Sequence, residues 1–183
     1  MAGTGLNRFT KADWLDFALQ TLAKNGPDGL SIERLCKSAR RTKGSFYHHF
    51  TDLQTFFDEL LLHWQQLNLH EPIEGSSQGN VPERLASLNK LASGIDPQVE
   101  IGLRRLASRN AQVQTAVTQV DNARIDYLVQ LYREGGMSAG DALNAAKMQY
   151  AGFVGAQTLW PESFEQESVV LGELLDELLR HMA

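Results

Sequence analysis

The sequence contains very little cysteine and no long uninterrupted apolar stretch. Cys36 is the only cysteine among the 183 residues, which excludes an internal disulfide and a zinc site built on several thiolates. No apolar run approaches the roughly eighteen residues that a membrane-spanning helix needs, and the first residues lack the continuous apolar stretch of a signal peptide. We therefore expect a cytoplasmic protein that does not cross a membrane.

The sequence also lacks the patterns typical of a catalytic or metal site. It has no glycine-rich phosphate loop, no nucleophile elbow and no paired-carboxylate motif. His48 and His49 are adjacent and would lie about 100° apart on a helix, which is poor geometry for sharing a metal. His63 and His70 have no convincing acid or thiol partner. We expect neither an enzyme nor a bound metal or cofactor.

What the sequence does contain is apolar residues at helical spacing from one end to the other. No segment shows the alternation of a strand, and there is no internal repeat. Capping residues and Gly or Pro stops predict helices over residues 10–25, 31–39, 42–50, 51–71, 81–93, 97–109, 112–134, 138–159 and 163–182. Thr51 is expected to cap the fourth of these, and Pro72 to end it within a flexible loop over residues 71–80. The predicted class is all-α with about nine helices.

Positive charge is concentrated in the first part of this acidic chain. Residues 1–50 hold eight Lys and Arg, Arg8 among them, against four acidic residues, a local balance of +4. The whole chain carries −5, so residues 51–183 carry −9. This asymmetry suggests that residues 1–50 form a domain that meets a polyanion and that residues 51–183 form a helical body with another task.

The segment RRTKGSFYHHF, residues 40–50, combines cations, hydroxyl groups and aromatic rings. Two short helices joined by a tight connection form a helix-turn-helix, whose second helix enters the major groove of DNA with its N-terminus first. Thr42, Lys43 and Ser45 would offer donors there, and Gly44 would let the backbone come close. Two short amphipathic helices with a few cations also occur in proteins that do not bind DNA, so spacing and charge alone leave both interpretations open.

The stretch GLSIERLCKSARRTKGSFYHHFTDLQTFF, residues 29–57, resembles the DNA-binding region of the tetracycline-repressor (TetR) family of bacterial transcription regulators. The resemblance is carried by Gly29, Ser31, Ile32, Leu35, Ala39, the run from Lys43 to Phe50, and the pair Phe56-Phe57. Residues 120–155 are similar, more loosely, to the regulatory half of one subset of the family. The resemblance implies an N-terminal helix-turn-helix head of three helices and a C-terminal helical body for effector binding and dimerisation.

The resemblance also implies a set of DNA contacts. They are Ser31, Thr42, Lys43, Ser45, Tyr47 and His48, with Lys43 and Ser45 nearest the bases and Tyr47 and His48 on phosphate. The family usually has a glycine and then an apolar residue in the turn, where this chain has Arg40 and Arg41. Either Arg40 holds a strained left-handed conformation, at a cost of about 1 kcal/mol, or the turn differs in shape. Both arginines are expected to add phosphate affinity.

The body contains candidates for a ligand cavity. Trp64, Tyr127, Met148, Tyr150, Phe153 and Trp160 could line a site for a small, mostly apolar effector, or could be plain core. Arg124 shares a helix face with apolar residues, so it could be drawn inward to pair with Asp121 or another carboxylate, or could bind the ligand.

The helix over residues 138–159 is apolar on two faces, and the last helix has an apolar stripe that ends at Met182. We expect these two helices to form half of an intersubunit four-helix bundle, and the alternative is burial within one chain. The interface residues would be Ala145, Met148, Gly152, Gly155, Ala156, Leu159, Leu171, Leu175 and Leu178.

Together, the residues and the resemblance predict a homodimeric, ligand-responsive transcription regulator, a repressor that binds a pseudo-palindromic operator. The alternative is a helical protein that binds a small molecule or docks a partner, with a head that does not bind DNA productively. The Arg40-Arg41 turn is the feature that suggests this alternative.

Overall fold

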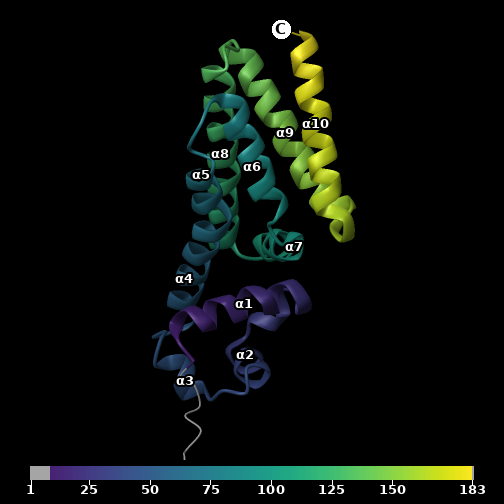
Figure 1. The fold of residues 1–183 in the computed structure, drawn as a ribbon. Coiled ribbons are helices and arrows are strands. Elements are labelled where there is room, and N and C mark those ends of the chain that lie inside the picture. Colours follow the sequence, from purple (N-terminus) through teal and green to yellow (C-terminus); the bar gives the residue numbers. More distant parts are fainter. Residues whose placement is uncertain (1–8, 183) are drawn as a thin grey trace, which may run out of the picture.

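The computed structural model describes the backbone of residues 9–182 and the side chains of residues 9–179 (Figure 1). The side chains of Arg8, counted above with the basic segment, and Met182, placed on the last apolar stripe, lie outside the described residues. Every regular element within the described range is helical, which confirms the all-α class.

The helices follow one another through short connections. They are α1 (Lys11–Asn25), α2 (Ile32–Ser38), α3 (Lys43–Tyr47), α4 (Leu53–Gln65), α5 (Glu71–Gly75), α6 (Val81–Ser93), α7 (Pro97–Ala107), α8 (Ala111–Glu134), α9 (Ala139–Leu159) and α10 (Phe164–Met182). Short 3-10 turns cover Pro27–Leu30 and Pro161–Ser163, and a π-helical turn covers Gln66–His70.

Local hydrogen bonds explain where several helices begin and end. Thr10 and Asp13 form a reciprocal capping box at the start of α1, in which Thr10 Oγ1 accepts from the Asp13 amide at 3.1 Å. α1 ends at Gly26, whose φ of 68° is a conformation that glycine adopts without strain. Ser138 caps α9, which ends at Trp160 as predicted.

The start and end of α4 differ from the prediction. Asp52 is the N-cap in place of Thr51, because its carboxylate accepts from the Thr55 amide at 2.7 Å. Pro72 does not stop the helix, since the π-helical turn before it shifts the hydrogen-bond pairing and Pro72 enters at the second position of α5. The predicted loop over residues 71–80 is therefore helical in its first half.

Residues 9–50 form a head whose core is largely aromatic. Trp14 of α1 and Phe46 of α3 meet edge to face, with ring centroids 5.4 Å apart. Phe46 also contacts Phe50 and Phe56, with centroids 5.0 and 5.2 Å away. All four rings are fully buried, and Phe56 belongs to α4, so α4 helps to hold α3 against α1.

The core of the head continues into the body, residues 51–183. Figure 1 shows α1 lying across the lower end of the body, next to α7. Gly102 of α7 allows close approach, since a Cβ at that position would lie 2.7 Å from Leu22 Cγ of α1. The same apolar cluster extends through Trp64 of α4 to Val120 of α8. The head and the lower body therefore share one hydrophobic core.

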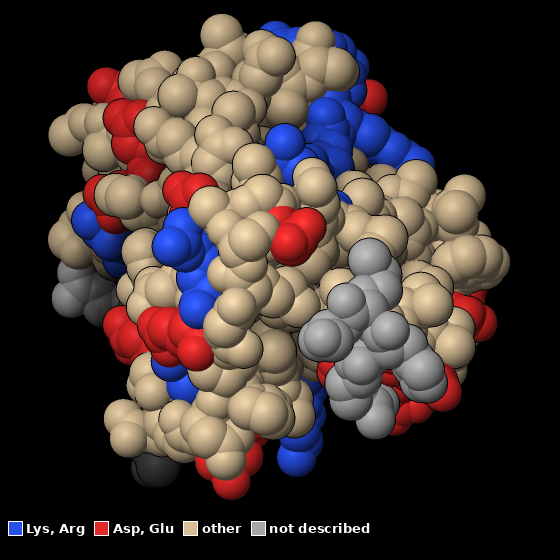
Figure 2. Space-filling view, turned by 90° about the horizontal axis from the view of Figure 1, so that it is seen from above, with Lys and Arg blue, Asp and Glu red and all other residues tan. Residues whose placement is uncertain are grey.

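The upper body is built from α6, α8, α9 and α10, with α9 and α10 running side by side along one edge (Figure 1). A second apolar cluster joins α6, α8 and α9 through Leu85, Leu131 and Ala142. On the face seen in Figure 2, Lys, Arg, Asp and Glu side chains are scattered among large areas of other residues. Within the described part of the chain, no helix has both the length and the apolar character required to cross a bilayer.

Candidate functional site

Side-chain caps define the starts of α2 and α3. Ser31 Oγ accepts from the Arg34 amide at 3.4 Å, and Thr42 Oγ1 accepts from the Ser45 amide at 3.2 Å. Between the two helices, Arg40 has a φ of 53°, which is the left-handed conformation given above as one of two possibilities. The chain thus makes the tight turn with an arginine where a glycine would be unstrained.

One face of α3 is buried and the other points outward. Phe46 has no exposed surface, whereas Tyr47 is 50% exposed. Lys43 and His48 are also exposed, and Ser45 is half-buried. α3 lies at the end of the molecule remote from the upper body, so a large partner can approach its outward face (Figure 1).

Arg41 differs from Arg40 in being half-buried. Its guanidinium carbon lies 5.1 Å from the centroid of the Phe9 ring, in a cation–π contact. His49 Nε2 lies 2.9 Å from the Phe9 carbonyl oxygen, so Phe9 is held against the end of α3 by both side chains. Of the two arginines expected to add phosphate affinity, Arg40 is exposed and Arg41 packs against the head.

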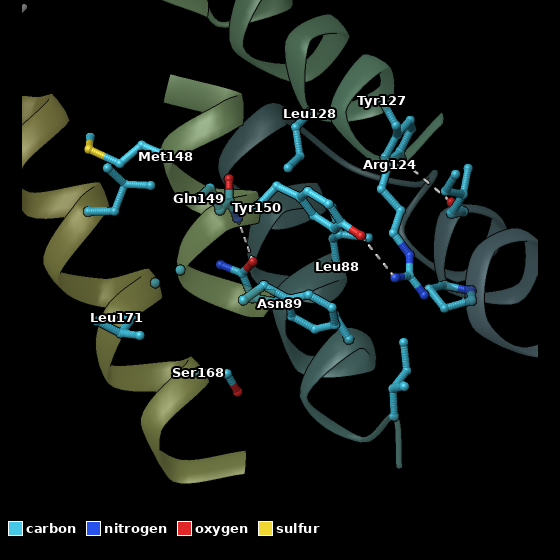
Figure 3. A pocket seen from close by; sticks show the side chains of 18 of the residues that line it. Leu88, Asn89, Arg124, Tyr127, Leu128, Met148, Gln149, Tyr150, Ser168 and Leu171 are labelled. Atoms are coloured by element: carbon cyan, nitrogen blue, oxygen red, sulfur yellow. Dashed lines mark hydrogen bonds between the residues drawn. The ribbon is translucent and has the colours of Figure 1, made fainter. Parts of the chain in front are cut away.

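The upper body contains a cavity of about 370 Å³ between α6, α8, α9 and α10 (Figure 3). Four predicted ligand-binding residues line it, namely Tyr127, Met148, Tyr150 and Phe153. Aliphatic side chains from α5, α6, α8 and α10 and from the π-helical turn before α5 make up most of the remaining wall. Its volume lies within the range of small-molecule sites in proteins.

Trp64 and Trp160 do not line this cavity, contrary to the prediction. Trp64 is buried in the core shared with the head, where its Nε1–H donates to Glu100 Oε1 at 3.0 Å. Trp160 is exposed at the end of α9. Helical spacing predicts which residues face inward, but it identifies neither the core that Trp64 enters nor the exposure of Trp160 at the helix end.

A buried ion pair closes one end of the cavity. Arg124 of α8 donates to the two carboxylate oxygens of Glu100 of α7, at 3.1 and 3.2 Å, and to the Asn68 carbonyl oxygen at 2.8 Å. Burial opposes the charge on Arg124, but Glu100 outweighs burial and the pKa of Arg124 is raised above its usual value. Arg124 therefore pairs with a carboxylate, and that carboxylate is Glu100 rather than Asp121.

Asp121 forms a second ion pair beside the first. Arg104 donates to its two carboxylate oxygens at 2.8 and 2.9 Å, and the Tyr150 hydroxyl donates to Oδ1 at 2.6 Å. Burial opposes ionisation of Asp121, but these hydrogen bonds hold its pKa below the usual range. Burial also raises the pKa of Tyr150 to about 12, so the hydroxyl is protonated at neutral pH. The two cations and two anions leave this end of the cavity without net charge.

The helix-turn-helix segment matches a known family model. Residues 15–60 match the model described as bacterial regulatory proteins, tetR family, a span that covers most of α1, all of α2 and α3, and the first part of α4. The match to the TetR family thus lies in the N-terminal part of the chain. This match supports a transcriptional regulator with a DNA-binding helix-turn-helix domain.

Solved structures share the fold over nearly the whole chain. A Pseudomonas aeruginosa PAO1 protein described as a transcriptional regulator aligns with a TM-score of 0.72 at 20% identity, covering 92% of this chain and 89% of that one. A TetR-like transcriptional regulator from Rhodococcus sp. RHA1 aligns with a TM-score of 0.66 at 17% identity, covering 94% and 95%. A protein of unknown function from the same organism gives 0.61 at 20%, covering 94% and 96%. No curated protein matches the sequence.

Some residues predicted to form a subunit interface are buried within the chain. Ala145, Ala156 and Leu175 have almost no exposed surface, because neighbouring helices of the same chain cover them. Leu171 and Leu175 line the cavity. The interface prediction is corrected for Ala145, Ala156 and Leu175, for which the alternative of burial within one chain holds, whereas Leu171 is half-buried at the cavity.

The other predicted interface residues form an open apolar surface on α9 and α10. Met148, Leu159 and Leu178 are each more than half exposed. Gly152 and Gly155 have open space around them, with no atom within 4 Å of the position that a Cβ would take. These five residues are called the α9–α10 surface below. Met148 and Leu178 also line the cavity, so the surface and the cavity adjoin.

Two residues of the ion-pair network, Glu100 and Arg104, were not identified from the sequence. They lie one turn apart on α7, beside Val99 and Leu103, which enter the core. Two opposite charges at i and i+4 among buried apolar residues were the available signal.

Proposed function

We propose that this TetR-family regulator is a repressor that binds a pseudo-palindromic operator as a homodimer and leaves it when a small molecule enters the body cavity. The observation that carries the proposal is α3, whose contact residues are exposed while Phe46 anchors the helix to the head. In this proposal residues 1–50 read DNA, and residues 51–183 serve dimerisation and effector binding.

Sequence reading is assigned to the N-terminal half of α3. A recognition helix enters the major groove with this half leading, which would put Lys43 and Ser45 near base edges and Tyr47 and His48 beside phosphates. The proposed contacts are Ser31, Arg40, Thr42, Lys43, Gly44, Ser45, Tyr47 and His48. Arg41 contributes indirectly, since its packing against Phe9 supports the end of the head that carries α3.

DNA binding should depend steeply on salt. Each neutralised phosphate is expected to contribute about −0.9 to the slope of log K against log salt concentration. Tyr47→Ala should weaken binding to all duplexes similarly, whereas Lys43→Ala should also reduce discrimination against unrelated sequence by about 1–3 kcal/mol. Fluorescence anisotropy with DNA from upstream of the protein's own gene, at several salt concentrations, measures both quantities.

Lys24→Ala is the matched control, because it removes the same charge from the far end of α1, away from α3. It should leave discrimination unchanged. Equal effects of Lys24→Ala and Lys43→Ala would count against α3 as the reading element. A complete absence of DNA binding would favour a helical protein that binds a small molecule or docks a partner.

Dimerisation is assigned to the α9–α10 surface. Exposed leucines beside glycines with open space suit the close approach of two further helices, which is how an intersubunit four-helix bundle packs. Two recognition helices on one rigid dimer would then match two half-sites of a palindrome.

Leu159→Asp should convert the protein from dimer to monomer and lower operator affinity by at least about tenfold, since a monomer engages one half-site. Analytical ultracentrifugation at micromolar concentration measures the first effect. Leu62→Asp is the control, because Leu62 on α4 is 64% exposed, close to the 67% of Leu159, and lies outside the proposed interface. A monomeric wild type, or a dimeric Leu159→Asp variant, would refute the assignment.

A short physical route connects the cavity with the head. Arg124 at the cavity holds Glu100 of α7, and Glu100 also accepts from Trp64 of α4. α7 in turn packs closely on α1 at Gly102. A ligand that packs against Arg124 and shifts this ion pair as a unit would therefore disturb both helices that support the head. Such coupling is reciprocal, so operator DNA should weaken ligand binding by the same factor as the ligand weakens operator binding.

A further inference from the structure

We propose that the cavity takes an uncharged, mostly apolar molecule with one oxygen acceptor, such as an aromatic or alicyclic ketone or ester, and that Asn89 Nδ2 donates to this oxygen. The inference rests on the effector part of the proposed function and specifies the chemistry of the effector. It follows from the orientation of one amide, from the pairing of nearby charges and from the apolar wall.

The orientation of the Asn89 amide is set by a relay across three helices. The Tyr132 hydroxyl of α8 donates to Gln149 Oε1 of α9 at 2.6 Å, and Gln149 Nε2 donates to Asn89 Oδ1 of α6 at 2.8 Å. Tyr132 is buried, and burial raises its pKa, which keeps the hydroxyl protonated as the first donor. The relay therefore uses the Asn89 oxygen and leaves the Asn89 nitrogen available.

Asn89 Nδ2 faces the cavity on the side of α10. Figure 3 shows the amide between α6 and α10, with its oxygen joined to Gln149 and its nitrogen turned the other way. A Cβ on Gly172 of α10 would lie 3.2 Å from Nδ2, and both residues line the cavity. Among the described residues, no atom accepts a hydrogen bond from Nδ2. Asn89 is half-buried and lines the cavity, so a ligand that brings an acceptor can complete the hydrogen bonding of this amide.

The charges around the cavity are already paired, which disfavours a charged ligand. A ligand carboxylate could reach Arg124 by displacing Glu100, but Glu100 is 2% exposed and would be left buried without its partner. A ligand ammonium group would find no carboxylate to pair with, because the described lining residues include no Asp or Glu. An uncharged molecule avoids both costs.

The apolar wall of the cavity determines the chemical character of the rest of the ligand. Leu88, Leu128, Phe153 and Leu171 line the same cavity as Asn89, each from a different helix, so a ring system suits the space beside the acceptor. Burial of that apolar area would supply most of the affinity, and the single hydrogen bond would supply orientation and selectivity.

The test compares three probes that share one skeleton. Benzophenone has an uncharged ketone, diphenylmethane lacks the oxygen, and 4-benzoylbenzoate adds a carboxylate. Without DNA, benzophenone should bind about three- to tenfold more tightly than diphenylmethane, the range expected for one hydrogen bond. It should bind about a hundredfold or more tightly than 4-benzoylbenzoate, because the carboxylate would be buried unpaired. Equilibrium dialysis gives all three dissociation constants.

Two variants locate the hydrogen bond. Asn89→Asp keeps the acceptor for Gln149 but replaces the donor by an oxygen, so the preference for benzophenone over diphenylmethane should disappear. Gly172→Ala leaves the amide intact and crowds Nδ2 from the opposite wall, so it should reduce the same preference even if Asn89→Asp does not fold. Asn122→Asp, an exposed change of the same kind on α8, should preserve the preference.

The outcomes separate this inference from the proposed function. Failure of benzophenone to bind, equal binding of the three probes, or an unchanged preference in both variants overturns the inference. Benzophenone binding as expected supports it, whether or not operator affinity changes. Suppose that benzophenone binds as expected but an anisotropy titration shows unchanged operator affinity. The proposed ligand class is then supported, and the effector response in the proposed function is contradicted.

Discussion

Glu100→Ala is expected to lower the free energy of unfolding by about 3–5 kcal/mol, the usual cost of removing one partner of a buried ion pair. The variant leaves the Arg124 guanidinium, 11% exposed, without its carboxylate, and it leaves the Trp64 Nε1–H without an acceptor. Urea unfolding followed by circular dichroism measures the change, provided that the transition remains two-state.

Glu59→Ala provides the surface comparison. Glu59 pairs with Lys11 at 2.8 Å between α4 and α1, but Lys11 is nearly half exposed, so the loss should be about 0–1 kcal/mol. The double variant Glu100→Met, Arg124→Met should lose less free energy of unfolding than its two single variants lose together, because neither buried charge is left without its partner. If Glu100→Ala lowers the free energy of unfolding by no more than Glu59→Ala does, the Glu100–Arg124 pair does not stabilise the body in the way described.

Phe46→Ala is expected to lower the free energy of unfolding by about 3–5 kcal/mol, because it removes a fully buried ring from the centre of the head. Phe46 contacts Trp14, Phe50 and Phe56, so the loss would loosen α3 from both α1 and α4. DNA binding should be lost as well, since the recognition helix would no longer be held in one orientation. Urea unfolding and anisotropy on the same preparation measure the two effects.

Tyr47→Ala separates anchoring from contact. Tyr47 is the next residue on α3 but is half exposed, so its removal should change stability by no more than about 0.5 kcal/mol while still weakening DNA binding. A stable Phe46→Ala variant that binds DNA normally would contradict the anchoring role. A Tyr47→Ala variant as unstable as Phe46→Ala would contradict the separation of the two faces.

Local signals in the sequence were sufficient for the head and for most helix boundaries. Thr10, Ser31, Thr42 and Ser138 cap the helices that they were expected to cap, because an N-cap needs only a side-chain oxygen and an amide two or three residues later. The left-handed Arg40 was one of two possibilities that the sequence left open, and the structure has that conformation.

The cavity and its polar groups depend on contacts between distant helices. Glu100, Arg124 and Trp64 come together from α7, α8 and α4, and their spacing in the sequence does not reveal that they meet. The same holds for Trp160, whose exposure depends on where α9 ends relative to its neighbours. Periodicity identifies the inward face of each helix, but the packing order of the helices decides what that face contacts.

The π-helical turn at Gln66–His70 makes the backbone contact of Arg124 sensitive to chain length. It contains one residue more per turn than α-helix, and its Asn68 carbonyl accepts from Arg124. Loss of one residue here would allow regular α-helix with little rotation of α4 relative to α5, but it would remove the widened turn that brings the Asn68 carbonyl oxygen to Arg124. Relatives that share this architecture should therefore vary in length at the turn over residues 76–80 before they vary within residues 66–70.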